Sequence, residues 1–379
     1  MAKALNTIAA VPGGARRVAG LNARRLVNAA RMAGGLDRPA VGCTPCDVVW
    51  RQDRVSLRRY RAGADPGRPA VLLVPSLINR SHVWDLRPGD SFVEGLLDRG
   101  YDVFLADWGV PDQRDADNSI ATYVDGYMPA IYGAALEQGG QTPAVIGHCF
   151  GGVLTLLWAA GQGDQPPALV SVATPTNWLE MGPLAAITRQ GRIEPEDVLD
   201  ATGNVPPQTL LRAFQMIRPL GDLSGYVTLW DRLHDRPTAQ AIRALSDWAH
   251  GHVPFPGAAF RELIRDLSRG NALYHGEVVL AGRARRLRDI SAPFLNLYGA
   301  HDHVSPPESV APLTDLVGSE DREGIQLRAG HVGLLVGGTA RKATLPTLHD
   351  WLQPRLAQAA PSPRVAVKPL AVAGEEAGA

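Results

Sequence analysis

Strand-like apolar runs alternate with helical patterns along most of the chain. The runs are four to six residues long and comprise residues 70–74, 101–106, 144–147, 169–173, 294–299 and 324–328. Runs of this length, bounded by turn residues, are typical of strands that are buried on both faces of a parallel sheet. Helical patterns lie between them, as in Phe92–Arg99 and Ile120–Leu136. We therefore expect an α/β fold whose mostly parallel sheet is covered by helices on both faces.

Two parts of the chain depart from this alternation. Residues 48–61 predict a pair of strands, with Val55 and Leu57 on one face. Residues 176–290 are rich in helical patterns and proline breaks, and no clear buried strand appears there before Phe294. This stretch predicts a helical cap inserted before the late strands of the core. The expected organisation is a basic N-terminal helical segment (1–43), a core (44–175 and 291–355), a helical cap (176–290) and a flexible tail (356–379).

Composition narrows the class of protein without identifying its chemistry. The chain has 379 residues, 45% of them apolar, and a formal net charge of zero, which suits a globular enzyme and argues against general nucleic-acid binding. Three cysteines give no disulfide framework and suit a reducing compartment. No apolar stretch reaches the ~18 residues of a membrane-spanning helix. We therefore expect a cytoplasmic protein.

The first 36 residues form a basic segment. They contain no acid, since the first is Asp37, and their basic residues are Lys3, Arg16, Arg17, Arg24, Arg25 and Arg31. No apolar region follows these charges, so we do not expect a secretory signal. We expect a partly amphipathic surface helix that docks a partner or an anionic surface.

The sequence Gly-His-Cys-Phe-Gly-Gly at residues 147–152 is the most informative motif. It follows the apolar run 144–146 and opens a helical pattern, Val153–Ala160. A strand, a tight glycine-flanked turn and a helix form the nucleophile elbow of the α/β-hydrolase fold, which lifts the central side chain beside the helix N-terminal amides. The competing interpretation of Cys149 is an inert buried thiol. The elbow favours a nucleophile.

An acid and a histidine follow Cys149 in the chain order that this fold requires. Asp302 comes after the strand-like run 294–299, and His331 comes after the run 324–328. A free thiol has a pKa of about 8.5 and is only slightly ionised at neutral pH, so a paired base matters. We expect His331 to take the Cys149 proton and Asp302 to fix the imidazole tautomer and stabilise its cation.

The fold position of the elbow also predicts which groups surround the reacting atoms. The oxyanion is expected between the backbone amides of Phe150 and Leu77. Ser76, Ile78 and Asn79 belong to the same loop as Leu77, so we expect them to line the site.

Other polar residues near these motifs have competing interpretations. Asp107 follows a strand but precedes the nucleophile, so we expect it to cap a turn. His303 either lines the site or is a solvated loop histidine. His148 is given no catalytic role. Cys43 and Cys46 form a C-x-x-C motif with no second pair or nearby histidine, and we expect no metal site.

The chain resembles the polyhydroxyalkanoate synthases, and among them the catalytic subunit of the two-subunit (class III) type. The resemblance spans Thr44 to Leu352 and rests on the joint order of the segments Val74–Arg80, Leu105–Asp112, Gly147–Gly152, Asp247–Leu267, His301–Pro307 and Gly330–Gly338. His148 and Phe150 stand where class III members often have an aliphatic residue and glutamine, and Ser76 replaces a proline. These departures bear on chain-length preference and subunit class.

The resemblance implies an acyltransferase that uses (R)-3-hydroxyacyl-CoA. The acyl group would pass to Cys149 and then to a growing polyester chain, with CoA released as a leaving group and no resident cofactor. Asp302 would also help to activate the substrate hydroxyl. The resemblance further implies a second synthase subunit, a homodimer or hetero-oligomer, and association with the surface of polyester granules.

Two alternatives stay open at this point. One is an acyl-CoA thioesterase, a polyester hydrolase or another acyltransferase of the α/β-hydrolase fold, since this fold carries many chemistries. The other is a non-catalytic granule-surface or partner-binding protein, which the basic N-terminal segment suggests.

Overall fold

The central feature is a sheet of eight strands in the order β1-β2-β4-β3-β5-β6-β11-β12. The structure is a computed structural model that describes residues 11–36, 39–60, 67–139, 141–189, 193–217 and 229–358. The strands of this sheet are β1 (Cys46–Gln52), β2 (Val55–Tyr60), β3 (Ala70–Val74), β4 (Asp102–Asp107), β5 (Ala144–His148), β6 (Leu169–Val172), β11 (Phe294–Gly299) and β12 (Arg322–Leu327). β1 and β2 pair antiparallel with their neighbours, and the other pairs are parallel. The predicted α/β architecture and its strands are confirmed.

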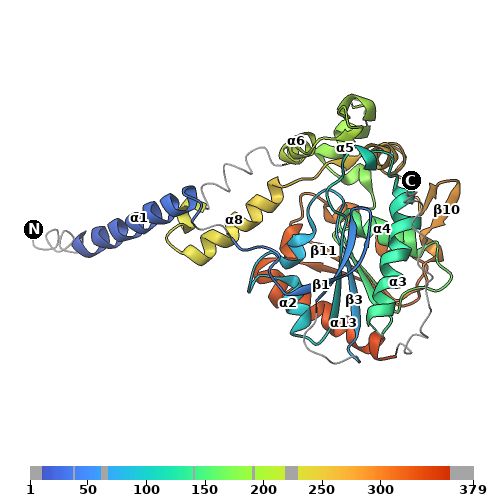
Figure 1. The fold of residues 1–379 in the computed structure, drawn as a ribbon, viewed down its shortest axis with the longest axis horizontal. Helices are drawn as coiled ribbons and strands as arrows, with labels where there is room; N and C mark the ends of the chain where they lie inside the picture. The colour runs from blue at the N-terminus through green and yellow to red at the C-terminus, as the bar shows by residue number, and fades with distance from the viewer. Residues whose placement is uncertain are drawn as a thin grey trace, which may run out of the picture.

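Both faces of the sheet are buried because successive side chains of a strand point to opposite faces. Leu72 of β3 belongs to one hydrophobic cluster, whereas its neighbours Val71 and Leu73 belong to the other. The helices α3 (Met128–Gly139) and α4 (Phe150–Ala159) contribute to the first cluster. The helices α2 (Phe92–Leu97) and α13 (Leu345–Gln358) contribute to the second. Figure 1 shows these helices around the sheet, as the unbroken apolar runs predict.

Several element boundaries differ from the sequence-based expectation. The helix expected over Phe92–Arg99 ends at Leu97. The pattern Ile120–Leu136 becomes a π-helix, Thr122–Tyr127, followed by α3. The flexible tail was expected from Leu356, but α13 continues to Gln358 with Leu356 buried at 8% exposure. Residues 359–379 of the expected tail lie outside the described residues.

Residues 176–290 are mostly helical in the structure. Their helices are η4 (Trp178–Glu180), α5 (Pro183–Arg189), η5 (Pro195–Val198), α6 (Pro207–Ile217), α8 (Arg236–His250), α9 (Gly257–Glu262), the π-helix η6 (Leu263–Arg269) and η7 (Leu287–Asp289). Figure 1 shows α5 and α6 at one end of the sheet.

This segment also contains four short strands that the sequence did not predict. β7 (Asn204–Val205) pairs with β8 (Phe255–Pro256), and β9 (Glu277–Leu280) pairs with β10 (Arg283–Arg286). The β9–β10 hairpin turns at Ala281 and Gly282, both of which have positive φ. Two positive φ values suit a two-residue hairpin turn, which usually carries Asn-Gly or Asp-Gly. Because Ala281 occupies the first position of the turn, the sequence does not show this Asn-Gly or Asp-Gly pattern.

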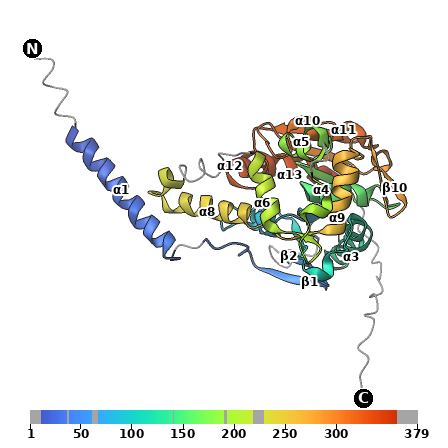
Figure 2. The same cartoon turned by 90° about the horizontal axis from the view of Figure 1, so that it is seen from above.

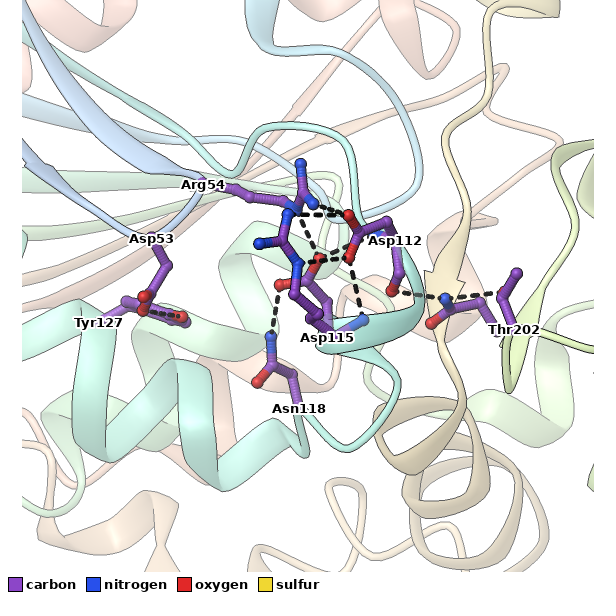
Figure 3. Close-up of polar contacts among 9 residues, drawn as sticks. Asp53, Arg54, Asp112, Asp115, Asn118, Tyr127 and Thr202 are labelled. Atoms are coloured by element: carbon purple, nitrogen blue, oxygen red, sulfur yellow. Dashed lines mark hydrogen bonds and ion pairs between the residues drawn. The ribbon is translucent and has the colours of Figure 1, made fainter. Parts of the chain in front are cut away.

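A polar network ties residues 200–205 to the core. Arg54, at the turn between β1 and β2, forms ion pairs with Asp112 and Asp115. The side chain of Asn204 donates to the backbone carbonyl of Asp112 at 2.8 Å and to Thr202 at 3.1 Å. These bonds join the β1–β2 turn, the loop after β4 and the start of β7 into one network, which Figure 3 shows. These bonds fix one side of the helical segment over the sheet.

The N-terminal helix α1 (Val11–Ala33) extends away from the sheet and lies beside the start of α8, as Figures 1 and 2 show. Arg25 donates to the carbonyl of Asp231 at 3.2 Å, and Asn28 donates to that of Leu233 at 2.6 Å. Residues 1–10, which belong to the expected basic segment, lie outside the described residues. None of the helices described here is both long and apolar enough to cross a membrane.

The turn from β5 into α4 depends on close backbone approach. A Cβ atom on Gly151 would lie 2.2 Å from the carbonyl oxygen of Val74 and 2.5 Å from that of Pro75. A Cβ atom on Gly147 would lie 2.6 Å from Gly152 Cα. The motif at residues 147–152 therefore needs glycine because α4 begins against the end of β3, where no side chain fits.

Gly151→Ala should destabilise the protein, because its new Cβ would meet backbone atoms that cannot move independently. We expect the free energy of unfolding to fall by about 1–3 kcal/mol, the usual range for overpacking. Urea denaturation measures this change. Gly126→Ala is the matched control, since a Cβ there meets no atom within 4 Å. Equal stability of the two variants would contradict the packing argument.

Candidate active site

Cys149 stands at the turn between β5 and α4 in a strained conformation. Its φ is 54° and its ψ is −126°, outside the regions that non-glycine residues commonly adopt. The backbone N–H of Cys149 donates to the carbonyl of Val172 in β6 at 2.9 Å, which holds the turn above the sheet edge. The Cys149 side chain is partly exposed. This is the local geometry that presents a nucleophile at a helix N-terminus.

Asp302 and His331 come from the loops after β11 and β12, which are neighbouring parallel strands. His331 Nδ1 lies 2.8 Å from Asp302 Oδ2, and the Asp302 carboxylate is buried. The other Asp302 oxygen accepts the N–H groups of Val304 and Ser305, each at 2.8 Å. The carboxylate is therefore fixed from both sides, and it can hold one tautomer of the His331 ring.

The environment of His331 favours its charged form. Burial by itself lowers the pKa of an imidazole, but the Asp302 carboxylate and the Cys149 thiolate outweigh it and hold the pKa of His331 well above 6.5. The structure thus brings Cys149, Asp302 and His331 together at one edge of the sheet. An arrangement of this kind can move a proton between a thiol and an imidazole.

His148 contacts His331, although the sequence interpretation gave it no catalytic role. The two ring centroids are 4.9 Å apart, so the His148 imidazole packs against the ring of His331. Burial, followed by repulsion from His331, holds the pKa of His148 well below 6.5. His148 is therefore neutral and helps to hold His331 in place.

The position of His148 could have been inferred from strand alternation. Its neighbour Gly147 faces α4, so His148 faces the opposite side of the sheet, where it packs against Trp84 with ring centroids 6.1 Å apart.

The loop that follows β3 is held next to Cys149 by two tryptophans. Trp108 Nε1 donates to the carbonyl of Pro75 at 2.9 Å, and Trp248 Nε1 donates to that of Arg80 at 2.8 Å. Among the described residues, the backbone N–H groups of Phe150 and Leu77 have no hydrogen-bond partner. Both amides are therefore available as donors to an oxyanion.

A cavity of about 210 Å³ opens beside Cys149, and we call it the thiol cavity. Three residues predicted from the sequence line it, namely Ser76, Ile78 and Asn79. His303 is exposed and is not among its lining residues, whereas its neighbour Val304 is. The described lining residues are Pro75, Ser76, Ile78, Asn79, Arg80, Val83, His148, Cys149, Phe214, Ile217, Trp248, Ala249, His252, Val304, His331 and Val332.

The sequence interpretation missed the residues that the helical segment contributes to this cavity. Phe214 comes from α6, Trp248 from α8, and His252 from the loop after α8. That loop is joined to the loop after β3, because Val253 N–H donates to the carbonyl of Ile78 at 3.0 Å. A hydrogen bond between loops so far apart in the chain has no motif or periodicity that would predict it from one sequence.

The remaining candidates do not join the site. Asp107 accepts the N–H of Gly109 at 3.1 Å and pairs with Arg58, so it caps the turn after β4, as expected. Cys43 and Cys46 are exposed free thiols. No group of three or more His, Cys, Asp or Glu residues in the described part of the chain is placed to hold a metal ion.

Comparison with known proteins gives consistent matches. Residues 69–337 match the family model described as the alpha/beta hydrolase fold. The chain is 31% identical to the poly(3-hydroxyalkanoate) polymerase subunit PhaC of Allochromatium vinosum, over 83% of this chain and 90% of that protein. The corresponding subunit of Synechocystis sp. is 29% identical, over 83% and 86%. A putative aryl esterase of Burkholderia cenocepacia has the same fold, with a TM-score of 0.50 and 18% identity over 83% of this chain and all of that one.

The raised pKa of His331 predicts a pH-dependent contribution to stability. A cationic histidine paired in the folded state stabilises it fully below pH ~6.5, and this contribution is lost as the pH rises through the folded pKa. The free energies of unfolding are compared among variants that all carry Cys149→Ala, so that titration of the Cys149 thiol does not overlap with that of His331.

In that background, the free energy of unfolding should fall above pH 6.5 by up to about 1.4 kcal/mol per pH unit, and adding His331→Gln should remove this slope. Denaturant titrations between pH 6 and 9 measure it. Adding His301→Gln, which changes an exposed histidine, should leave the slope in place. An unchanged slope with His331→Gln would contradict the pairing.

His148→Leu should reduce the reactivity of Cys149 near neutral pH, because the His331 ring loses the ring contact that helps to hold it in place. One lost ring pair corresponds to ~1 kcal/mol, or about fivefold in the rate of alkylation by iodoacetamide. The rate is measured with Cys43→Ser and Cys46→Ser present, so that only Cys149 reacts. His148→Phe retains an aromatic ring at this position, so the alkylation rate should fall less than in His148→Leu. If His148→Leu were alkylated at the wild-type rate, the contact between His148 and His331 would have no influence on the reactivity of Cys149.

Proposed function

This chain belongs to the PhaC family of poly(3-hydroxyalkanoate) polymerase subunits, acyltransferases with the α/β-hydrolase fold, and we propose that Cys149, His331 and Asp302 carry its reaction. Cys149 is the nucleophile, His331 is the general base and acid, and Asp302 orients His331. The observation that carries this assignment is the hydrogen-bonded Asp302–His331 pair beside a thiol on a strained elbow.

The first step transfers the acyl group from CoA to the enzyme. The Cys149 sulfur attacks the thioester carbonyl of (R)-3-hydroxyacyl-CoA, and its proton passes to His331 Nε2. The bond between the carbonyl carbon and the CoA sulfur breaks, and His331 returns the proton to that sulfur. One thioester replaces another, so the acyl-enzyme stays reactive toward an alcohol.

The second step forms the ester bond of the polymer. The hydroxyl of another hydroxyacyl unit attacks the acyl-enzyme carbonyl, and His331 takes the hydroxyl proton. The bond to the Cys149 sulfur breaks, and the thiol regains that proton. Asp302 stabilises the His331 cation in both steps and, through it, helps to activate the substrate hydroxyl.

The backbone amides of Phe150 and Leu77 form the proposed oxyanion hole. Their lack of partners among the described residues supports this role, since an oxyanion hole needs donors that no other group occupies. The side chains of Ser76, Ile78 and Asn79 surround the substrate at the cavity wall. CoA is a substrate leaving group here, so the scheme uses no resident cofactor.

We also propose that the working enzyme is an assembly with a second subunit, located at polyester granules in the cytoplasm. The naming of the relatives as subunits supports this proposal. Sedimentation analysis of the complex from native cells should give a mass that is no whole multiple of the 40.5 kDa chain. A particle built only from copies of this chain would contradict it.

The decisive assay for the chemistry follows both products of the reaction. The complex isolated from native cells is mixed with (R)-3-hydroxybutyryl-CoA, released CoA is quantified, and the acyl product is identified by mass spectrometry. We expect CoA release together with oligoester. Release of CoA with monomeric hydroxy acid alone would indicate a thioesterase instead.

Substitutions separate the roles of the three residues in this assay. Cys149→Ala should abolish CoA release, and Asp302→Asn should lower the rate about 10⁴-fold, because the His331 tautomer is then wrong. Cys46→Ala, which removes an exposed thiol outside the site, is the matched control and should keep full activity. Oligoester formation by Cys149→Ala would refute the assignment.

A further inference from the structure

A second cavity is also lined by Cys149, and we call it the apolar cavity; among the described residues, His331 lines only the thiol cavity. Its volume is about 140 Å³, somewhat smaller than that of the thiol cavity. The two cavities share four wall residues, namely Ile78, Cys149, Phe214 and Val304. An acyl group on Cys149 can therefore reach either space.

The walls of the apolar cavity come from the elbow and the helices above it. Phe150 forms the wall next to Cys149, and Leu184 of α5, Leu210 of α6 and Phe260 of α9 form the more distant walls. Phe150 also packs against Phe255 with ring centroids 5.8 Å apart.

The apolar cavity offers almost nothing to a polar ligand. No charged side chain lines it among the described residues. The Thr188 hydroxyl donates to the carbonyl of Leu184 at 2.9 Å and also contacts Ser268. One indole donor, Trp178 Nε1, belongs to a wall residue and has no partner within the described part of the chain. A hydrocarbon chain gains from burial in such a space without losing hydrogen bonds to water.

The thiol cavity also has mostly apolar walls, but it differs from the apolar cavity because it has charged and polar side chains among its wall residues. Arg80, Asn79 and His252 are among its wall residues, and His252 Nδ1 has no partner among the described residues. These groups suit the amides and phosphates of CoA better than a hydrocarbon chain. The CoA end of the substrate therefore belongs in the thiol cavity.

A growing polyester strand is a poor occupant of the apolar cavity. Such a strand carries an ester carbonyl in every unit, and most of those acceptors would be buried without a donor. An alkyl side chain has no such group. The methyl side chain of a 3-hydroxybutyryl group would leave most of the cavity empty.

We infer that the apolar cavity binds the hydrocarbon side chain on C3 of the acyl group, so that the enzyme prefers (R)-3-hydroxyacyl-CoA substrates with side chains of several carbons. This inference rests on the proposed function, because it needs the acyl group on Cys149. It goes further by naming the substrate class: medium-chain hydroxyacyl groups bind better than 3-hydroxybutyryl.

The test compares kcat/KM for CoA release from (R)-3-hydroxybutyryl-CoA, (R)-3-hydroxyhexanoyl-CoA and (R)-3-hydroxyoctanoyl-CoA. We expect kcat/KM to rise about fourfold for each methylene that enters the cavity. A preference for the 3-hydroxybutyryl substrate would overturn the inference and leave the function in place. Absence of CoA release with every chain length would overturn the proposed function as well.

A matched pair of variants on α6 locates the effect. Ala213 lines the apolar cavity and is half-buried, whereas Arg212 is exposed and lines neither cavity. Ala213→Phe should lower the ratio of octanoyl to butyryl kcat/KM at least tenfold, and the milder Ala213→Val should lower it less. Arg212→Phe adds the same ring outside the cavity and should keep the wild-type ratio.

The same variants distinguish the two possible occupants. If the polyester strand filled the apolar cavity, Ala213→Phe and Ala213→Val would shorten the oligoester made from (R)-3-hydroxybutyryl-CoA and leave the kcat/KM ratio unchanged. That result would overturn the inference.

Discussion

The close approach of α4 to the ends of β3 and β5 is the constraint on which the site depends. Gly151 lies so near the carbonyl groups of Val74 and Pro75 that no side chain fits between them. This contact sets the position of the Cys149 turn and, at the same time, that of the loop that supplies Leu77. The proposed nucleophile and the proposed oxyanion donors are therefore placed by one packing contact. The strain at Cys149, with its φ of 54°, is maintained because the surrounding backbone allows no other conformation.

The remaining groups reach the same edge because parallel strands bring their carboxyl ends together. β11 and β12 are neighbours in register, so Asp302 and His331 meet once each strand has ended. A buried carboxylate is costly unless it is hydrogen-bonded, and Asp302 meets this requirement with His331 and two backbone amides. The helical segment completes the enclosure by pairing with the loop after β3. This leaves two spaces beside the thiol, and of these only the thiol cavity has charged side chains among its described wall residues.

Much of the fold could be predicted because buried parallel strands leave a strong pattern. The run at residues 70–74 corresponds residue for residue to β3, and the elbow motif lies between β5 and α4 as expected. The β9–β10 hairpin was missed because Ala281 replaces the usual Asn or Asp of its turn. The wall residues Phe214, Trp248 and His252 could not be found, since their approach to Cys149 follows from three-dimensional packing. His148 was the avoidable omission, because alternation along β5 already directs it away from α4.

The central claim is that acyl groups are carried on the Cys149 sulfur, and mass spectrometry of the acylated protein tests it most directly. Butyryl-CoA has no 3-hydroxyl, so it can acylate the enzyme but cannot serve as the attacking alcohol for a further unit. After incubation of the full chain with butyryl-CoA and rapid acid quenching, the account predicts one butyryl group per chain, located on the peptide that contains Cys149. An adduct found only on Cys43 or Cys46, or CoA release with no adduct on Cys149, would contradict it.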